Sequence, residues 1–471
     1  MFIGREKELK KLQEFKQRSI AGIIVVSGRR RIGKSTLIEH FSQGTRFLEF
    51  YGLSPREGIT LQTQLDHFGH LLGKAFDLPD MKFDNWNNAL RMLAGMTAKG
   101  KVIILLDEIS WMAGSDKDFT GKLKGLWDTE FKKNPELILI LCGSVTSWIQ
   151  DNILNDKGFM GRVSLAFTLE EMPLYDANKF WGHSLVSSYE KFKVLCVTGG
   201  IPRYLEEIHP KETAEQNIKR LCFTKEGLLV EEFEKIFKDI FNTQADDYKQ
   251  IVIALADGSC EQNNLCEKLG IAPTGGLSKK LRVLTQSGFI TRDFVWENGK
   301  KKPKSSKYRL RDNYLRFYLK YIDPKKHLID QGLYEDLFLE DLPQWQTILG
   351  YQFENLVLNN LPVLLKHLHI APSSVLSAAP YFQKATNRKK ACQIDLLIQC
   401  RQSIYLCEIK FRNKITPEVI DEVNDKISKL NIPKGISIRP VLIYQGELSP
   451  KIAQSDVFAH LIPFDQLLES K

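Results

Sequence analysis

The sequence reads Ile23-Ile24-Val25-Val26-Ser27-Gly28-Arg29-Arg30-Arg31-Ile32-Gly33-Lys34-Ser35-Thr36 in its first part, and this stretch decides the fold there. The apolar residues predict a buried strand, and the pattern GxxxxGK[ST] stands between that strand and a helical pattern. Glycines let backbone N–H groups turn toward phosphates, and the start of a helix adds positive partial charge. The stretch therefore predicts a P-loop that binds a nucleotide; a coincidental glycine loop is the alternative.

Four side chains in and beyond this loop can supply the chemistry of a nucleotide site. Lys34 would reach the β and γ phosphates, and Ser35 would ligate Mg²⁺. A second apolar strand, residues 102–106, ends in Asp107 and Glu108. Asp107 would hold the metal, directly or through water, and Glu108 would polarise the attacking water as a general base. An ordinary strand end that happens to be acidic is the alternative.

A third apolar strand, residues 137–142, is followed by Gly143 and Ser144. The Ser144 hydroxyl could sense the γ phosphate from between the other two strands, although a polar residue here is also an ordinary helix N-cap. Arg162 follows at the distance expected of an arginine that senses charge. It could act on its own nucleotide or on that of a neighbouring subunit, or it could be a surface arginine.

The order of apolar patterns predicts an α/β protein of several parts. Residues 1–165 alternate strands and helices, as a parallel sheet covered by helices does, and residues 166–242 read as a helical lid. Three short helices and a hairpin across residues 243–326 predict a winged helix. Residues 327–345 read as a linker, and residues 346–471 form a second α/β unit.

Positive charge is concentrated near the expected winged helix. Residues 296–326 carry eleven basic and three acidic side chains, so they account for most of the chain's net charge of +9. Such a surface suits phosphate contact with DNA, while many winged helices bind protein instead and lysines also keep hairpin tips soluble. The third helix would offer Thr274, Ser278, Lys279, Lys280 and Arg282, and the wing Lys300, Lys301, Lys302, Lys304 and Lys307.

The last α/β unit contains carboxylates within apolar strands. Asp395 begins one strand, and Glu408 and Lys410 share a face of the next because side chains alternate along a strand. Asp395 and Glu408 could hold Mg²⁺ against a scissile phosphate, Lys410 could position or activate water, and Glu354 could complete the metal shell from a helix. One solvated strand face is the alternative.

These motifs together resemble those of the AAA+-related STAND and archaeal-type ATPases. The resemblance rests on Phe2-Ile3-Gly4-Arg5-Glu6, the P-loop, Leu105 to Glu108, Leu141 to Ser144 and Thr198-Gly199-Gly200-Ile201-Pro202. It implies an ATPase that uses ATP and Mg²⁺, with Arg5 and Pro202 near the base. Asp395, Glu408 and Lys410 resemble the PD-(D/E)xK nucleases, which implies a restriction-endonuclease-like fold; the usual Pro-Asp is Ile-Asp here.

The composition and the apolar runs indicate the cellular compartment and the partners to expect. The longest apolar runs are far shorter than the roughly 20 residues that cross a bilayer, and the first residues carry no secretory pattern. The eight cysteines form no CxxC pair, as expected of buried thiols. We therefore expect a cytoplasmic protein with ATP and DNA or RNA as partners, no membrane, and an oligomeric state left open.

The expected function is an ATPase whose nucleotide state controls nucleic-acid binding and, through the last unit, cleavage. Two alternatives remain open. The C-terminal unit could bind without cutting, as in a regulatory switch, or the protein could be a signalling ATPase whose winged helix recruits a protein.

Overall fold

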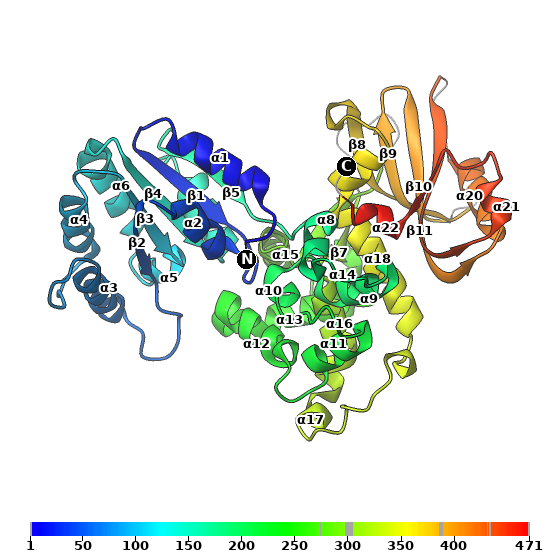
Figure 1. Cartoon of the computed structure of the whole chain (residues 1–471), viewed down its shortest axis with the longest axis horizontal. Helices are drawn as coiled ribbons and strands as arrows, with labels where there is room; N and C mark the ends of the chain where they lie inside the picture. Colours follow the sequence, from blue (N-terminus) through cyan, green and yellow to red (C-terminus); the bar gives the residue numbers. More distant parts are fainter. Residues whose placement is uncertain are drawn as a thin grey trace. The chain divides into compact units, whose positions relative to one another are not determined.

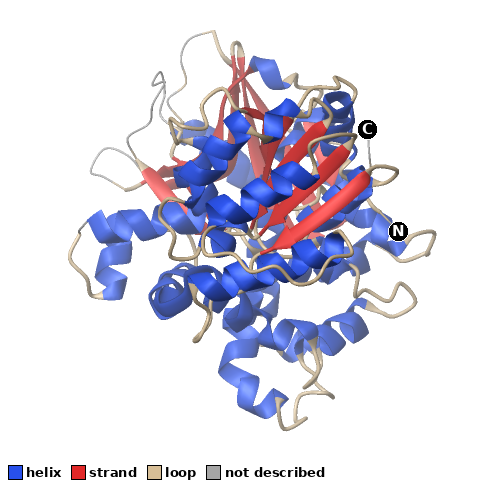
Figure 2. Ribbon diagram, turned by 90° about the vertical axis from the view of Figure 1, so that its left-hand side faces the viewer, coloured by secondary structure: helices blue, strands red, loops and turns tan. Residues whose placement is uncertain are grey.

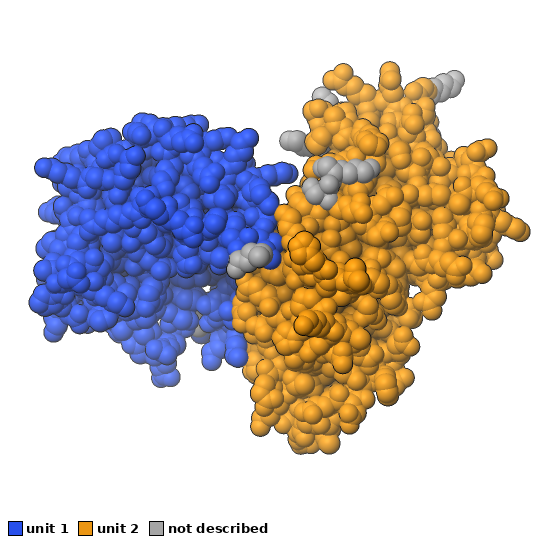
Figure 3. Space-filling model, viewed as in Figure 1, with its two compact units in different colours: residues 1–171, 235–245, 286–288 blue, residues 172–234, 246–285, 289–471 orange. Residues whose placement is uncertain are grey.

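The protein is described by a computed structural model that covers residues 2–273, 275–296, 305–385, 390–430, 432 and 435–469, and its two five-stranded sheets belong to separate compact units. Unit 1 comprises residues 1–171, 235–245 and 286–288 (Figure 3). Unit 2 comprises residues 172–234, 246–285 and 289–471. No helix in the described part of the chain is both long enough and apolar enough to span a bilayer.

Unit 1 is built on a five-stranded, fully parallel sheet in the order β2-β3-β4-β1-β5 (Figure 1). Its strands are β1 (Gly22–Ser27), β2 (Arg46–Tyr51), β3 (Val102–Asp107), β4 (Leu137–Gly143) and β5 (Val163–Thr168). Every residue of β1, β3 and β4 is buried, as continuous apolar runs predict for a sheet covered on both faces. Parallel strands all end at one edge, so the loops after β1, β3 and β4 meet there.

Helices cover the unit 1 sheet (Figure 2). The first two are α1 (Glu6–Lys16) and α2 (Lys34–Ser42). Three more, α3 (Leu61–Ala75), α4 (Trp86–Met96) and α6 (Phe119–Thr129), share one hydrophobic core with Ile23 and Val25 of β1. Edge-to-face contacts of Trp86 with Phe68 and Phe119 fix how these helices pack.

The predicted end of the first α/β part at residue 165 is too early. Strand β5 continues to Thr168 and pairs with β1 along its length, and unit 1 continues to Glu171. Residues of β5 alternate between partly buried and exposed, since β5 is an edge strand. Its apolar signal is therefore weaker than that of the central strands.

Unit 2 begins with helices. They include α8 (Leu174–Ala177), α9 (Ser188–Thr198), α10 (Pro202–Leu205), α11 (Ala214–Cys222) and the first half of α12 (Leu228–Phe241). Next come α13 (Ala245–Leu255), α14 (Gln262–Leu269), α15 (Gly275–Gln286) and the antiparallel strands β6 (Ile290–Phe294) and β7 (Ser306–Leu310). Three helices followed by a hairpin is the order that the sequence predicts.

The last part of unit 2 is a mixed five-stranded sheet in the order β12-β11-β10-β9-β8. Its strands are β8 (Val375–Gln383), β9 (Cys392–Cys400), β10 (Ser403–Ile415), β11 (Ser437–Leu448) and β12 (His460–Pro463). Strand β9 is antiparallel to both of its neighbours, β8 and β10, whereas β10, β11 and β12 are parallel to one another. Helix α18 (Trp345–Asn359) contacts β10, and α20 (Glu418–Lys429) contacts β9.

The expected hairpin and the C-terminal sheet are parts of one unit. Trp296, which follows β6, is 4% exposed and lies in a core with Ile394 and Leu406. Its indole Nε1 donates a hydrogen bond to Gln399 at 2.8 Å. The predicted linker, residues 327–345, also contributes buried Leu339 and Leu342, so it packs against unit 2 instead of spanning two free domains.

Candidate functional site

The P-loop lies between β1 and α2 in unit 1. Gly28 has φ 150°, and a Cβ there would lie 2.7 Å from the carbonyl oxygen of Leu169. Gly33 has φ 83° at the start of α2, a conformation that glycine adopts without steric cost. Lys34 is 7% exposed, and its Nζ donates a hydrogen bond to the carbonyl of Arg29 at 3.1 Å. This hydrogen bond holds the Lys34 ammonium group against the backbone of the P-loop.

Ser35 and Asp107 meet although they lie 72 positions apart in the sequence. The Ser35 hydroxyl donates to Asp107 Oδ2 at 2.8 Å, and the backbone N–H of Glu108 donates to Oδ1 at 2.8 Å. Asp107 is 9% exposed. A hydroxyl and a carboxylate beside a phosphate-binding loop are the oxygen ligands that Mg²⁺ takes together with phosphates and water. The residues present therefore fit the expected magnesium ion.

Glu108 and Ser144 are brought together by the order of the strands. Strand β4 lies between β1 and β3, as the sequence predicts for Ser144. The Ser144 N–H and hydroxyl both donate to Glu108 Oε2, at 3.0 and 2.8 Å. Glu108 has a left-handed backbone with φ 46°. Its carboxylate is therefore held in a defined position at the edge of the sheet.

The arginines of the expected site have different surroundings. Arg162 donates through Nε and Nη2 to Asp128, with a shortest distance of 2.7 Å, and through Nη1 to the carbonyl of Gly158. This guanidinium lowers the pKa of Asp128. Arg5 is 5% exposed, and its Nη2 donates to the carbonyls of Ile32 and Glu170 at 3.0 and 2.7 Å. Arg5 thus holds the P-loop backbone.

The other P-loop residues divide into buried and exposed positions. Arg29 is 5% exposed and lies 3.7 Å from Glu171, and Ile32 is fully buried. Arg31 and Thr36 are exposed. Pro202 belongs to unit 2, where it is the first residue of α10, and it is buried. Its expected role near the base stays a prediction.

Asp239 is a partner of the P-loop that the sequence did not reveal. Arg30 forms an ion pair with Asp239, from the part of α12 that belongs to unit 1. The Arg30 guanidinium also lies 5.2 Å from the ring centroid of Trp111, and Ser54 donates to Asp239 at 3.3 Å. An aspartate on a helix more than 200 residues away gives no pattern in the sequence that could identify this contact.

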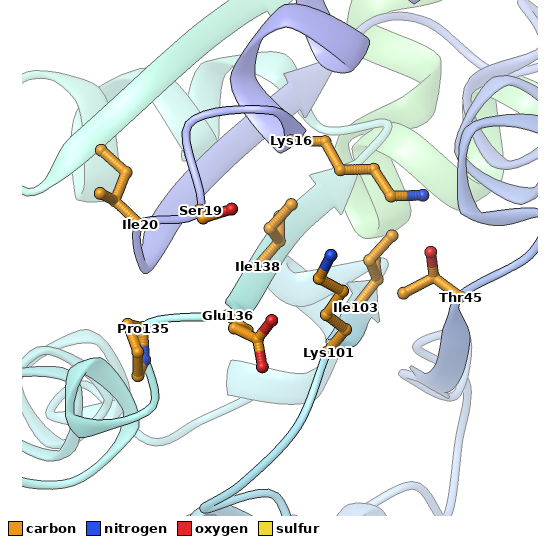
Figure 4. Close-up of a pocket in the computed structure, with 9 residues that line it drawn as sticks. All are labelled: Lys16, Ser19, Ile20, Thr45, Lys101, Ile103, Pro135, Glu136 and Ile138. Carbon is orange, nitrogen blue, oxygen red and sulfur yellow. The ribbon is translucent and has the colours of Figure 1, made fainter.

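A hollow in unit 1 lies at the other edge of the sheet (Figure 4). Lys16, Ser19, Thr45 and Lys101 line it, before the first residues of β1, β2 and β3, with Ile138 as part of its floor. Burial and the charge of Lys101 lower the pKa of Lys16. Because the P-loop follows the carboxyl end of β1, this hollow is not part of the nucleotide site.

The C-terminal carboxylates lie in unit 2. Glu408 is 1% exposed, and its carboxylate accepts hydrogen bonds from Lys426 at 2.6 and 2.7 Å. Lys410 lies 2.8 Å from the same carboxylate and 2.7 Å from Glu422. Lys410 was expected from the alternation of the strand. Lys426 comes from α20 and was not.

Burial and the negative charge of Glu408 raise the pKa of both Asp395 and Glu354. The N–H of Ile409 donates to Asp395 at 2.8 Å. Burial, then the charges of Glu408 and Glu354, raise the pKa of Asp395. Burial also raises the pKa of Glu354, which Arg309 and Arg316 counteract. The structure therefore places Asp395 and Glu408 on the paired strands β9 and β10.

The described residues contain no group of three or more His, Cys, Asp or Glu side chains arranged to hold a metal ion. Asp395 and Glu408 on neighbouring strands still offer the two carboxylates that Mg²⁺ commonly takes from a protein, with water and phosphate completing its shell. Glu354 as a further metal ligand stays a prediction.

The expected DNA-contacting residues are described only in part. Thr274, Lys300, Lys301, Lys302 and Lys304 lie outside the described residues. Lys280 pairs with Asp247 at 2.6 Å, and Ser278 accepts a hydrogen bond from Gln262 at 2.8 Å. Lys279 is exposed. The Lys307 ammonium lies 3.6 Å from the ring centroid of Phe382 on β8.

Two family models match the chain. Residues 2–208 match a model described as an ATPase domain predominantly from Archaea, which covers the P-loop, Asp107, Glu108 and Ser144. The expected resemblance to archaeal-type ATPases is thereby confirmed for this part, which is an ATPase domain. Residues 318–424 match a model described as archaeal and bacterial proteins of unknown function, so the nuclease resemblance stays a prediction.

Individual proteins are also similar. An uncharacterized protein of Methanocaldococcus jannaschii is 26% identical over 359 residues, 75% of this chain and 76% of that protein. A Walker-type ATPase of Pyrococcus abyssi has 17% identity and a TM-score of 0.49, covering 68% of this chain and 96% of its own. The ORC2 protein of Aeropyrum pernix has 14% identity and a TM-score of 0.40, covering 70% and 94%.

Proposed function

We propose that this protein is a Mg²⁺-dependent ATPase that couples its nucleotide state to the binding of nucleic acid. The observation that carries the ATPase part is the 2.8 Å hydrogen bond between Ser35 and Asp107 beside the P-loop. In this proposal the loop N–H groups and Lys34 bind the phosphates, and Ser35 and Asp107 hold the metal. When bound, Mg²⁺ supplies positive charge to the phosphate oxygens.

Glu108 is the general base of this proposal. It orients the attacking water after its carboxylate turns away from Ser144, whose N–H and hydroxyl then become donors for the γ phosphate. Arg162 senses the charge of the nucleotide after leaving Asp128. Whether it acts on its own nucleotide or on that of a neighbouring subunit depends on the oligomeric state.

Coupling would pass through Arg30. This P-loop residue pairs with Asp239 on α12, a single helix whose first residues belong to unit 2 and whose last belong to unit 1. A phosphate in the loop competes with Asp239 for the Arg30 guanidinium, because both are anions that bind it with charge-assisted hydrogen bonds. Nucleotide binding would thereby change how the end of α12 is held.

Glu108→Gln tests the ATPase proposal. We expect ATP turnover to fall by about 100-fold to 10,000-fold, because an amide cannot accept the proton, while fluorescent ATP-analogue binding is retained. Glu130→Gln is the matched control, since Glu130 pairs with Lys133 on the surface of the same unit. Retained turnover in Glu108→Gln would show that another group is the base.

We further propose that the helices α13 to α15 with the β6–β7 hairpin are a winged helix, and that the C-terminal sheet is a nuclease-like unit. The support is that Asp395 and Glu408 lie on the paired strands β9 and β10, with Lys410 at 2.8 Å from Glu408. Asp395 and Glu408 would hold Mg²⁺ against a phosphate, and Lys410 would position water.

A regulatory ATPase of STAND type, with a C-terminal unit that binds without cutting, is the second candidate. It is favoured by one observation: Lys410 and Lys426 already occupy the carboxylate of Glu408. The winged helix would then bind nucleic acid or a protein partner.

A nuclease assay separates the two candidates. Mg²⁺-dependent cutting of DNA or RNA that disappears in Asp395→Ala and Lys410→Ala would establish the nuclease. No cutting with ATP, ADP or Mn²⁺ would favour the regulatory ATPase. Asp425→Ala serves as the control because Asp425 is a carboxylate on the exposed side of α20, paired with Lys429.

A further inference from the structure

A hollow of about 290 Å³ lies in unit 2 where the hairpin meets the C-terminal sheet. Lys307 of β7 lines one side, and Phe382, Gln383, Lys384 and Gln393 of the β8–β9 region line the other. This volume is near the lower end of the range for small-molecule sites. Neither the ATPase chemistry nor the carboxylate group uses it.

The lining combines one aromatic ring, two ammonium groups and the carboxylate of Glu261. The Lys307 Nζ lies 3.6 Å from the centroid of the Phe382 ring. Lys384 lies 3.0 Å from Glu261, and its side chain is 76% exposed. Burial, and to a smaller extent the charge of Lys384, lower the pKa of Lys307, whereas the charge of Glu261 counteracts them. The carboxylate of Glu261 thus offsets part of the positive charge of the two lysines, and a phosphate in the hollow would compete with Glu261 for them.

The hollow lies close along the chain to the carboxylates. Gln393 lines it, and Asp395 is two residues further along β9 on the same face of the strand. At 3.3 Å per residue the two Cα atoms are roughly 6.6 Å apart. A ligand chain that passes through the hollow could thus reach Asp395 with its next unit.

We propose that this hollow is a subsite for one nucleotide of a single-stranded nucleic acid, a proposal that rests on the nucleic-acid part of the proposed function. The base stacks on Phe382, and the Lys307 ammonium moves from the ring to a phosphate, which Lys384 also contacts. The amide of Gln393, which lies directly across from Phe382 on the neighbouring strand, can donate to and accept from a base edge. A paired base could not reach the ring, so the site selects unpaired strands.

The test is binding of a fluorescent oligothymidylate to the full-length protein, followed by anisotropy over a range of salt concentrations. Loss of stacking in Phe382→Ala should weaken binding about 5-fold to 150-fold. Phe382→Trp should restore it because the larger ring keeps a stacking face. Phe382→Leu retains apolar volume without a ring, so it should bind as weakly as Phe382→Ala even if the alanine variant is less stable.

The salt dependence isolates the phosphate contacts. Lys307→Met and Lys384→Met should each reduce the slope of log K against log salt by about 0.7, a change that a merely structural role would not produce. Lys451→Met, at an exposed lysine of α21 (Pro450–Ala453), is the matched control and should leave the slope unchanged.

Two results would overturn the proposal in different ways. A wild-type protein that binds no oligonucleotide would overturn both the subsite and the nucleic-acid part of the proposed function. Wild-type binding that persists unchanged in Phe382→Ala, Lys307→Met and Lys384→Met would overturn the subsite alone. ATP turnover should stay at the wild-type rate in all these variants, since every substituted residue lies in unit 2.

Discussion

The carboxylate of Glu408 is almost completely removed from solvent, and the ammonium groups of Lys410 and Lys426 compensate its charge. A buried carboxylate needs such partners because the loss of hydration otherwise costs several kcal/mol. A divalent cation at Glu408 would have to share the carboxylate with these lysines or displace one of them. Lys426 thus competes with the proposed metal.

Lys426→Met should therefore strengthen metal binding to the C-terminal unit. We expect a lower Kd for Mn²⁺, measured by the loss of the free-ion paramagnetic resonance signal in an Asp107→Ala background that removes the proposed metal ligand of unit 1. Lys429→Met is the control, because Lys429 lies on the same helix but pairs with Asp425. Equal Mn²⁺ affinity in wild type and Lys426→Met would contradict the competition.

Sequence patterns identified some of these residues and missed others for a physical reason. Lys410 follows from Glu408 because alternate residues of a strand share a face. Lys426 is one of several charged residues on α20, and only the packing of that helix on the sheet selects it. The same holds for Asp239, whose partner Arg30 lies in a distant loop. Contacts set by tertiary packing leave no local signal.

At the scale of an element, the connection from α9 to α10 depends on close backbone contact. Gly199 ends α9 with φ 57°, and a Cβ on Gly200 would lie 2.2 Å from the carbonyl oxygen of Met172. The Met172 N–H donates to the Gly200 carbonyl at 2.7 Å. Packing in unit 2 thus explains the second glycine of the Gly-Gly-x-Pro motif without reference to a nucleotide.

Gly200→Ala should destabilise unit 2 by about 1–3 kcal/mol, because the added methyl group forces two backbone segments apart. Chemical denaturation followed by circular dichroism measures this change. Gly125→Ala in the exposed middle of α6 meets no atom within 4 Å and should be neutral or stabilise by about 0.5–1 kcal/mol. A Gly200→Ala protein as stable as wild type would show that the contact relaxes easily.

The elements themselves were predicted best where the pattern is strongest. Continuous apolar runs located β1, β3 and β4, since strands covered on both faces contain few polar residues. Strand β8 gave no such signal: most of its residues are partly buried, it contains Pro380, and it lies at the edge of its sheet. Edge strands can carry polar residues and prolines, so their sequences resemble loops.

At the scale of the whole molecule, the chain was expected to fold as separate modules in sequence order. The hairpin, the residues 327–345 and the C-terminal sheet instead belong to one unit. Trp296 is the residue that most directly joins the hairpin to that sheet, through its buried ring and its hydrogen bond to Gln399. The lysines that follow Trp296 in the sequence suggested a wing that packs against no other part of the protein.

Trp296→Ala should lower the stability of unit 2 by about 3–5 kcal/mol and leave unit 1 unchanged. Differential scanning calorimetry with and without ATP checks this, because bound ATP raises the melting temperature of the unit that binds it. Trp86→Ala, at a fully buried residue of the unit 1 core, should have the opposite pattern. If Trp296→Ala lowered the ATP-sensitive transition instead, the assignment of Trp296 to a separate core would be wrong.

The division of α12 between the units also limits how the protein can be shortened for experiments. A fragment that stops at Glu171 contains the whole P-loop and every strand of its sheet, yet it lacks Asp239 and leaves Arg30 without that carboxylate. Fragments of this protein should therefore not be assumed to have the properties of the intact chain. An N-terminal fragment without ATPase activity would not count against nucleotide hydrolysis by the whole protein.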